Sequence, residues 1–151
     1  MPSTKPPRLA VRAILVHRGK LLLVNAWPDG KSDLFCAPGG GVQPHSALPD
    51  NLKREVFEET GLMIEVGHLC LVNEFHDPKR GFHQVELFFK CTVEDGALPE
   101  GWQDPEAIVT DRRWVTPEEL RLMRVKPDSL KNNAFSKWDS PLYDPLEHIV
   151  V

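Results

Sequence analysis

The chain has 151 residues, of which 41% are hydrophobic and 26% charged, and its formal net charge at pH 7 is −4. This size and composition predict a single globular domain over residues 1–151, and the negative net charge argues against nucleic acid as a partner. Since no apolar run is long enough to span a bilayer, we also expect no membrane partner.

The start of the chain and its cysteines favour a cytoplasmic protein. Residues 1–7 lack the apolar core of a signal peptide and are predicted to form a disordered lead-in. The three cysteines are odd in number and do not have the spacing of a metal site; they are Cys36, Cys70 and Cys91. Reduced thiols, each part of the packing, are therefore expected in a cytoplasmic protein.

The first elements predicted are two strands joined by a tight turn. Apolar and β-branched residues favour strands at residues 9–16 and 21–24. Between them, His17-Arg18-Gly19-Lys20 has the composition of a hairpin turn. A run of three glycines at residues 39–41 then predicts a second turn, directly before a helix.

The ends of this helix are marked by capping residues. Ser46 can cap a helix and Pro49 fits a first turn, so the helix is expected to begin between these two positions. Gly61 stands where a left-handed C-cap is expected. The apolar side of the helix, which should pack inward, consists of Leu52, Val56 and Phe57.

The opposite side of the helix carries a group of acids. Glu55, Glu58 and Glu59 fall at positions i, i+3 and i+4 and therefore share one face. Each pair of like charges costs an isolated helix about 0.2–0.5 kcal/mol. A hard divalent cation with oxygen ligands would relieve this repulsion, so the face is a candidate metal site.

The second half of the chain predicts more strands and one helix. A turn is expected at residues 77–81, a loop at residues 94–107, and a helix that opens with a capping box at Thr116-Pro117-Glu118-Glu119. The further strands are expected at residues 69–75, 82–93 and 108–115.

The segment at residues 40–62 resembles the signature box of the Nudix hydrolases. That box reads Gly, five residues, Glu, seven residues, and then Arg-Glu-aliphatic-any-Glu-Glu-any-Gly-aliphatic. One position departs from the pattern, because Ser46 stands where the family has its first glutamate. The positions that match are Gly40, Arg54, Glu55, Val56, Glu58, Glu59, Gly61 and Leu62.

The resemblance implies a fold and a reaction. The fold would be of the α/β (α+β) class, an α/β/α sandwich around a mixed β-sheet. The reaction would be hydrolysis of a phosphoanhydride bond in a nucleoside diphosphate joined to another group, with Mg²⁺ or Mn²⁺ neutralising the developing charge. The partner would then be a small nucleotide derivative.

The resemblance also implies roles for particular residues. Glu58 and Glu59 would be metal ligands, Glu55 a ligand or the base that activates water, and the Gly39 carbonyl a further ligand. Arg54 would orient the neighbouring carboxylates through paired hydrogen bonds. Gly40 and Gly41, with Gly39, would let the backbone approach metal and phosphate closely.

Family members often add an acid from the loop before the last strand. Glu106 is the first candidate for this further metal ligand, because it precedes Trp114 by about the distance at which such an acid often lies. Asp104, Asp111 and Glu86 remain alternatives.

Ser46 leaves two outcomes open. A serine brings no negative charge, so we expect a weaker metal site that still supports hydrolysis. The alternative is a domain that binds a nucleotide ligand as a sensor without turnover. A second alternative, an RNA 5′-end pyrophosphohydrolase, would need a basic groove, which the acidic composition does not favour.

The sequence gives fewer indications of the residues that bind the rest of the substrate. Several aromatic residues could include a pair that stacks on a base, although such residues more often belong to the core. The C-terminal residues 132–151 could cover the sheet or meet a second subunit, so a homodimer stays open. The aromatic candidates are Trp27, Phe35, Phe75, Phe82, Trp102 and Trp138.

Overall fold

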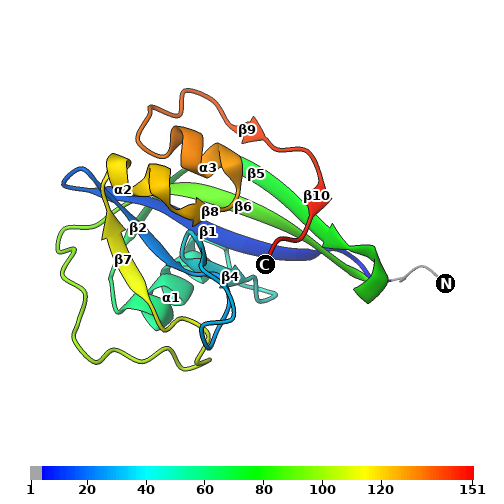
Figure 1. The fold of residues 1–151 in the computed structure, drawn as a ribbon, viewed down its shortest axis with the longest axis horizontal. Coiled ribbons are helices and arrows are strands. Elements are labelled where there is room, and N and C mark those ends of the chain that lie inside the picture. The colour runs from blue at the N-terminus through cyan, green and yellow to red at the C-terminus, as the bar shows by residue number, and fades with distance from the viewer. Residues whose placement is uncertain (1–4) are drawn as a thin grey trace.

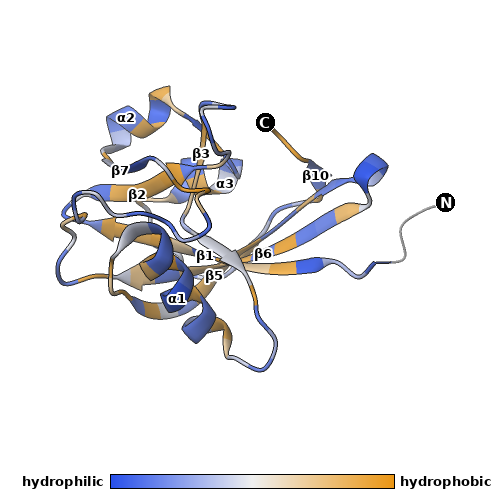
Figure 2. Ribbon diagram, turned by 90° about the horizontal axis from the view of Figure 1, so that it is seen from below, coloured by the Kyte–Doolittle hydropathy of each residue, from blue (hydrophilic) through white to orange (hydrophobic). Residues whose placement is uncertain are grey.

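A mixed β-sheet with helices on both faces forms the centre of the structure, a computed structural model that describes residues 5–151 (Figure 1). Helix α1 (Leu48–Thr60) lies on one face, and α2 (Pro117–Leu122) and α3 (Asp128–Asn133) lie on the other (Figure 2). The expected α/β/α sandwich is confirmed. Of the expected lead-in, residues 1–4 lie outside the described residues.

The sheet has the order β10-β5-β6-β1-β2-β3-β8, to which β4 adds on β1, β7 on β2 and β9 on β5. It is mixed because β1 runs parallel to β6 but antiparallel to β2 and β4. The strands are β1 (Arg8–His17), β2 (Lys20–Asn25), β3 (Leu34–Cys36), β4 (Gly39–Gly41), β5 (Glu65–Asp77), β6 (Phe82–Thr92), β7 (Arg112–Val115), β8 (Arg124–Val125), β9 (Leu142–Tyr143) and β10 (Glu147–His148).

Two hydrophobic clusters hold the layers together. On one face, Leu15 and Leu22 pack with Leu52 and Val56 of α1. The other face is filled by a cluster that includes Ile14, together with side chains from α2 and α3. Because side chains alternate along a strand, β1 contributes to both clusters, which places it at the centre of the molecule.

The predicted ends of α1 are confirmed, but its capping residue is not Ser46. The N-cap is Ala47, which makes no side-chain capping bond, and Pro49 lies in the first turn. Gly61 ends the helix with φ 77°, the left-handed cap that was expected. Phe57 does not pack inward, because its side chain lies at the rim of the apolar face, is 44% exposed and contacts the edge of Trp102.

The three glycines form a strand and not a turn. Strand β4 pairs antiparallel with β1, so that Val11 lies opposite Gly40. A Cβ on Gly39, where φ is 154°, would collide with the Val11 carbonyl oxygen. Glycine is therefore needed at this position because the backbone of β1 lies too close for a side chain, and not because the chain turns here.

The hairpin of β1 and β2 and the capping box of α2 are as predicted, whereas the strand expected at residues 108–115 is shorter. Only β7 forms at its end. The Asp104 carboxylate accepts hydrogen bonds from the N–H groups of Ile108 and Val109, at 3.2 and 2.9 Å, and this turns the backbone away from a strand. The expected turn at residues 77–81 contains a 3-10 helix, η1 (Pro78–Arg80).

The C-terminal segment extends the sheet at its edge. Strands β9 and β10, orange and red in Figure 1, both pair parallel with β5. The tail thus lies along the edge of the sheet, and a contact with a second subunit stays a prediction. Among the described residues, no helix is both long and apolar enough to cross a membrane.

Candidate active site

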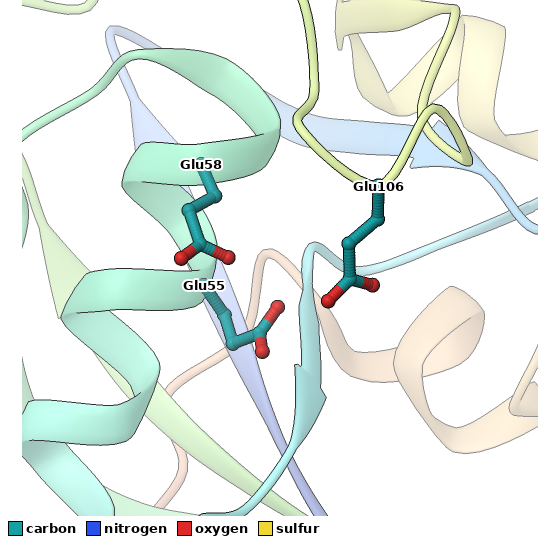
Figure 3. A group of neighbouring side chains, drawn as sticks. All are labelled: Glu55, Glu58 and Glu106. Carbon is teal, nitrogen blue, oxygen red and sulfur yellow. The ribbon is translucent and has the colours of Figure 1, made fainter.

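Three carboxylates from two distant parts of the chain meet beside α1. Glu55 and Glu58 lie one turn apart on the helix, and Glu106 comes from the long loop before β7 (Figure 3). Each offers one oxygen, and these three oxygens lie within 4.8 Å of one another. We call this group the carboxylate cluster. Carboxylate oxygens at this spacing suit a hard divalent cation such as Mg²⁺.

Arg54 holds two of these acids in place. Its Nη1 donates to Glu55 Oε1 at 3.0 Å and to the Glu58 carboxylate at 3.4 Å. Its Nη2 donates to Oδ1 of Asn51 at 3.3 Å, and Asn51 in turn accepts the N–H of Gln43. The guanidinium thus connects the helix to the loop before it and orients both carboxylates, as its position in the sequence suggested.

Glu59 lies outside the carboxylate cluster. One of its oxygens accepts the N–H of Gly39 at 3.3 Å, and its side chain is buried. Burial raises the pKa of Glu59 to about 8, an effect only partly offset by the nearby positive charge of Arg12 and by the Gly39 hydrogen bond. Burial also raises the pKa of Glu55, against the lowering effect of Arg54. A cation beside these two carboxyl groups would favour their ionised forms.

Strand β4 lies directly against the acids of α1. A Cβ added to Gly40 would lie 2.5 Å from Cδ of Glu55, and one on Gly41 would lie 2.5 Å from Nη2 of Arg8. The Gly39 carbonyl accepts a hydrogen bond from Nη1 of Arg12 at 3.3 Å. The glycines therefore make room for the carboxylate of Glu55 and for a guanidinium at the same wall.

The three alternatives to Glu106 have other partners. The Asp104 carboxylate binds backbone N–H groups of its own loop, including that of Glu106 at 3.0 Å. Asp111 forms an ion pair with Arg113, at 2.8 Å. Glu86 is buried and pairs with Arg12, at 2.7 Å. Asp104 thus acts on the loop that presents Glu106, a role that the sequence did not indicate.

Ser46 lies in the exposed turn before α1. Its carbonyl accepts a hydrogen bond from Nδ2 of Asn51 at 3.0 Å. The buried Asn51 also binds the Ala47 carbonyl, so this amide fixes the turn from which the helix begins. The local shape at the substituted position is therefore maintained by Asn51.

Two adjoining cavities lie next to these residues. The first, of about 290 Å³, is lined by the glycines of β4 and by Glu55, Glu59 and Glu106, and we call it the acidic cleft. The second, of about 200 Å³, is lined by aromatic side chains, and we call it the aromatic pocket. Its aromatic residues are Trp27, Phe75, Phe82 and His148. Arg12, Ala26 and Cys36 border both cavities.

Two polar residues of these cavities were missed from the sequence. Arg12 bridges Glu86 and the Ala37 carbonyl, at 2.7 and 3.1 Å, and so stands at the border of the two cavities. A single charge within the apolar run of β1 was the signal for it. Asn73 lines the aromatic pocket, is 3% exposed, and has an Oδ1 atom without a hydrogen-bond partner among the described residues.

The remaining aromatic candidates lie elsewhere. Trp102 donates its indole N–H to the Glu58 carbonyl at 2.8 Å and so ties the long loop to α1. Phe35 and Trp138 are buried in the core beside α3. Of the six aromatic candidates, three therefore border a cavity and two are core residues.

Comparisons with known proteins agree with this geometry. The model of a family described as the NUDIX domain matches residues 6–138. The "Putative ADP-ribose pyrophosphatase YjhB" of Bacillus subtilis (strain 168) is 29% identical over 145 residues, which make up 94% of this chain and 63% of that protein. The chain thus spans less than two thirds of that relative.

A second curated relative and a solved structure complete the picture. The "MutT-like protein" of Streptomyces ambofaciens is 30% identical over 121 residues, which make up 78% of this chain and 71% of that protein. The structure described as "NUDIX hydrolase from Nitrosomonas europaea" has a TM-score of 0.67 and 22% identity, over 81% of this chain and 82% of that one. At this identity the structural likeness supports the fold alone.

Proposed function

The chain belongs to the NUDIX domain family, and from this membership we propose that it is a pyrophosphohydrolase of nucleotide derivatives. The substrate is a nucleoside diphosphate linked to another group, and the cofactor is Mg²⁺ or Mn²⁺. The observation that carries the proposal is the meeting of Glu55, Glu58 and Glu106, of which Glu55 and Glu106 line the acidic cleft. Two relatives whose names denote a putative ADP-ribose pyrophosphatase and a MutT-like protein support the same reaction class.

The donor set fits a hard divalent cation. The ligand atoms of Glu55, Glu58 and Glu106 are all carboxylate oxygens, and the close approach of Gly40 leaves no space for a side chain beside them. A bound ion would neutralise charge on the phosphoryl oxygens and on the leaving phosphate. The buried Glu59, behind these residues, lies in an environment that favours its ionised form only when positive charge is added.

Side chains in and beside the cleft have three further roles: orienting the acids, activating water and binding phosphate. Arg54 keeps Glu55 and Glu58 oriented, which fixes the position of the water they would activate or hold. Glu55 is the base we favour, because burial raises its pKa and a stronger base accepts a proton from water more readily. Arg8 also lines the acidic cleft, beside Gly41, and is positioned to bind a phosphate oxygen.

The aromatic pocket is the proposed binding site for the second half of the substrate. It shares Arg12, Ala26 and Cys36 with the acidic cleft, so it is the neighbouring site for the rest of a ligand whose diphosphate lies in the cleft. The rings of Phe75 and Phe82 lie 5.9 Å apart and offer a surface for a planar group. The free Oδ1 of Asn73 accepts one hydrogen bond, which favours a ring with an N–H donor, such as a nucleobase.

The cellular location and the partners complete the proposal. All three cysteines are free, and burial raises the pKa of the Cys36, Cys70 and Cys91 thiols. Neutral, buried thiols of this kind suit the reducing cytoplasm. The partner we propose is a small nucleotide derivative, and the whole chain acts as one domain.

A panel of substrates tests the function. Product release is measured for ADP-ribose, nucleoside diphosphate sugars, dinucleoside polyphosphates and nucleoside triphosphates, with Mg²⁺, with Mn²⁺ and with a chelator. Glu58→Gln should lower the rate by at least about 10²-fold, because one charged ligand is lost at the site of developing charge. Glu118→Gln, at an exposed position of α2, is the matched control and should keep the full rate.

Three outcomes would contradict the proposal. Ligand binding without product release, with every metal, would make the domain a sensor. Release of pyrophosphate from triphosphorylated RNA alone, with no turnover of small substrates, would make it an RNA-end enzyme. Turnover that is equal in Glu58→Gln and in the wild type would remove the carboxylate cluster from the reaction.

A further inference from the structure

Three of the six histidines lie in a row across neighbouring strands. His76 of β5 is the direct partner of His83 on β6, and His148 of β10 is the direct partner of His76 on its other side. Partners in register project their side chains from the same face of a sheet. The chain therefore brings three imidazoles together from residues that are up to 72 positions apart, since 148 − 76 = 72. We call this group the histidine row.

Two members of the histidine row, His76 and His83, do not line the aromatic pocket, whereas His148 borders it. Phe75 precedes His76 and points into that pocket, so alternation directs His76 to the other side. Glu74, two residues before His76, shares its face and reaches across to His83. The row is accessible, because His148 is exposed and the side chain of His83 is 36% exposed.

The spacing of one pair of rings suits a metal ion held by two imidazoles. The ring centroids of His76 and His148 lie 5.0 Å apart, and those of His76 and His83 lie 6.0 Å apart. Two imidazoles bound to Zn²⁺ at about 2.0–2.1 Å with tetrahedral angles have their ring centroids roughly 5 Å apart. The ligand nitrogens of the three rings do not lie within 4.8 Å of one another in this structure, so binding requires the two outer rings to turn about their side-chain torsions toward His76.

A carboxylate already fixes one of these rings. Nε2 of His83 lies 3.1 Å from Oε1 of Glu74, whose other oxygen accepts the hydroxyl of Tyr143. With its ring proton on Nε2, His83 donates this hydrogen bond to the Glu74 carboxylate. Nδ1 of His83 is then left with a free lone pair, as in the carboxylate–histidine–metal arrangement of many zinc sites.

We propose that His76, His83 and His148 form a second metal site, which binds a transition-metal ion of the zinc class. Imidazole nitrogens select such ions over Mg²⁺, whereas the carboxylate cluster has only oxygen ligands. The site also has a structural effect, because its ligand His148 follows Glu147 on β10, and Glu147 lines the aromatic pocket. A bound ion therefore fastens the C-terminal segment that closes this pocket.

Zinc binding to the whole chain tests the site without any turnover. Zn²⁺ is titrated calorimetrically at about pH 7.5, in an excess of Mg²⁺ that occupies the carboxylate cluster. The wild type should bind one ion, and His76→Ala should weaken binding by at least about tenfold. His68→Ala removes an exposed imidazole from the same strand and should bind as the wild type does.

Limited proteolysis measures whether Zn²⁺ holds the C-terminal segment in place. Trypsin can cut after the exposed Lys137 and release the C-terminal segment. Zn²⁺ should slow this cleavage in the wild type but not in His148→Ala, which removes the only ligand that the segment contributes. If Zn²⁺ slows cleavage equally in both proteins, the ion does not hold the C-terminal segment through His148.

Two results of the titration would overturn the site itself. One is an affinity for Zn²⁺ that is the same in His76→Ala and in the wild type, while both proteins remain folded by circular dichroism. The other is a loss of binding with Cys36→Ser, which would place the ion in the aromatic pocket. Either result would leave the proposed hydrolysis untouched, since neither measurement depends on substrate.

Discussion

The Cα of Gly40 lies so close to Glu55 that a methyl group on Gly40 would fall 2.5 Å from the carboxyl carbon. Gly40→Ala should therefore push this carboxylate out of the carboxylate cluster. We expect a fall in kcat/KM of up to about 10²-fold, because a displacement of about 1 Å is enough for such a loss. Steady-state kinetics at several Mg²⁺ concentrations measure it.

A double-mutant cycle separates this cause from a general disturbance. If Gly40 acts through Glu55, the double variant with Glu55→Gln should be no slower than Glu55→Gln alone. Losses that multiply would instead show that the alanine damages the cleft by another route.

Arg54 should set the acidic limb of the pH–rate profile. Its charge lowers the pKa of Glu55, which burial otherwise raises, so Arg54→Ala should move the limb to higher pH. Arg54→Lys should restore part of the shift, because it keeps the charge but loses the paired geometry. The profile of kcat/KM is compared with that of Arg121→Ala, an exposed arginine on α2. An unmoved limb in Arg54→Ala would contradict the prediction.

Glu59 should make the metal-free protein less stable as the pH rises. Its folded pKa is about 8, against an ordinary value of 4.5, so the folded state holds a proton that the unfolded state loses between these pH values. The free energy of unfolding therefore falls as pH rises from about 4.5 to about 8, and changes no further beyond that. Urea denaturation with a chelator, compared with Glu59→Gln, measures the slope. Equal slopes in the two proteins would disprove the assignment.

Asp104 should act on catalysis through Glu106. Its carboxylate accepts three backbone N–H groups of the loop, so Asp104→Ala leaves buried donors unpaired and should cost about 1–3 kcal/mol of stability. The activity should fall as well, since Glu106 loses its position. Asp95→Ala removes a comparable but exposed turn contact, to the N–H of Ala97, and is the control. Thermal melting and rates are measured together.

Ser46→Glu should tighten Mg²⁺ binding only slightly. The position is exposed, so a new charge there is screened and worth less than about 1 kcal/mol, or about fivefold in affinity. Ser46→Gln controls for side-chain size, and metal titration by calorimetry gives the comparison. A gain well beyond fivefold would mean that position 46 belongs to the metal site itself.

Local features of the chain predicted α1 and its surroundings well. Helix periodicity and the Gly61 cap are properties of neighbouring residues, so the helix and its acidic face could be recognised without any tertiary contact. The error at Phe57 has a different origin, because the apolar arc of a helix has no sharp edge and only the loop with Trp102 decides what lies against it.

Other features depend on contacts that no local pattern records. Glycines 39–41 form a strand because β1 lies beside them, and the residues expected as a strand before β7 follow the carboxylate of Asp104 instead. The early part of β5 was missed since its register shifts twice between Val66 and Leu71. The histidine row likewise follows from strand register alone, so no spacing in the sequence could reveal it.

Because strands β9 and β10 occupy the edge of β5, the order of synthesis matters for this chain. A ribosome makes residues 65–77 long before residues 142–148, so during translation the edge of β5 stays open to pairing with other chains. We therefore expect nascent or C-terminally truncated forms to need chaperones more than the finished protein does. Residues made well after β5 thus complete both the sheet and the wall of the aromatic pocket.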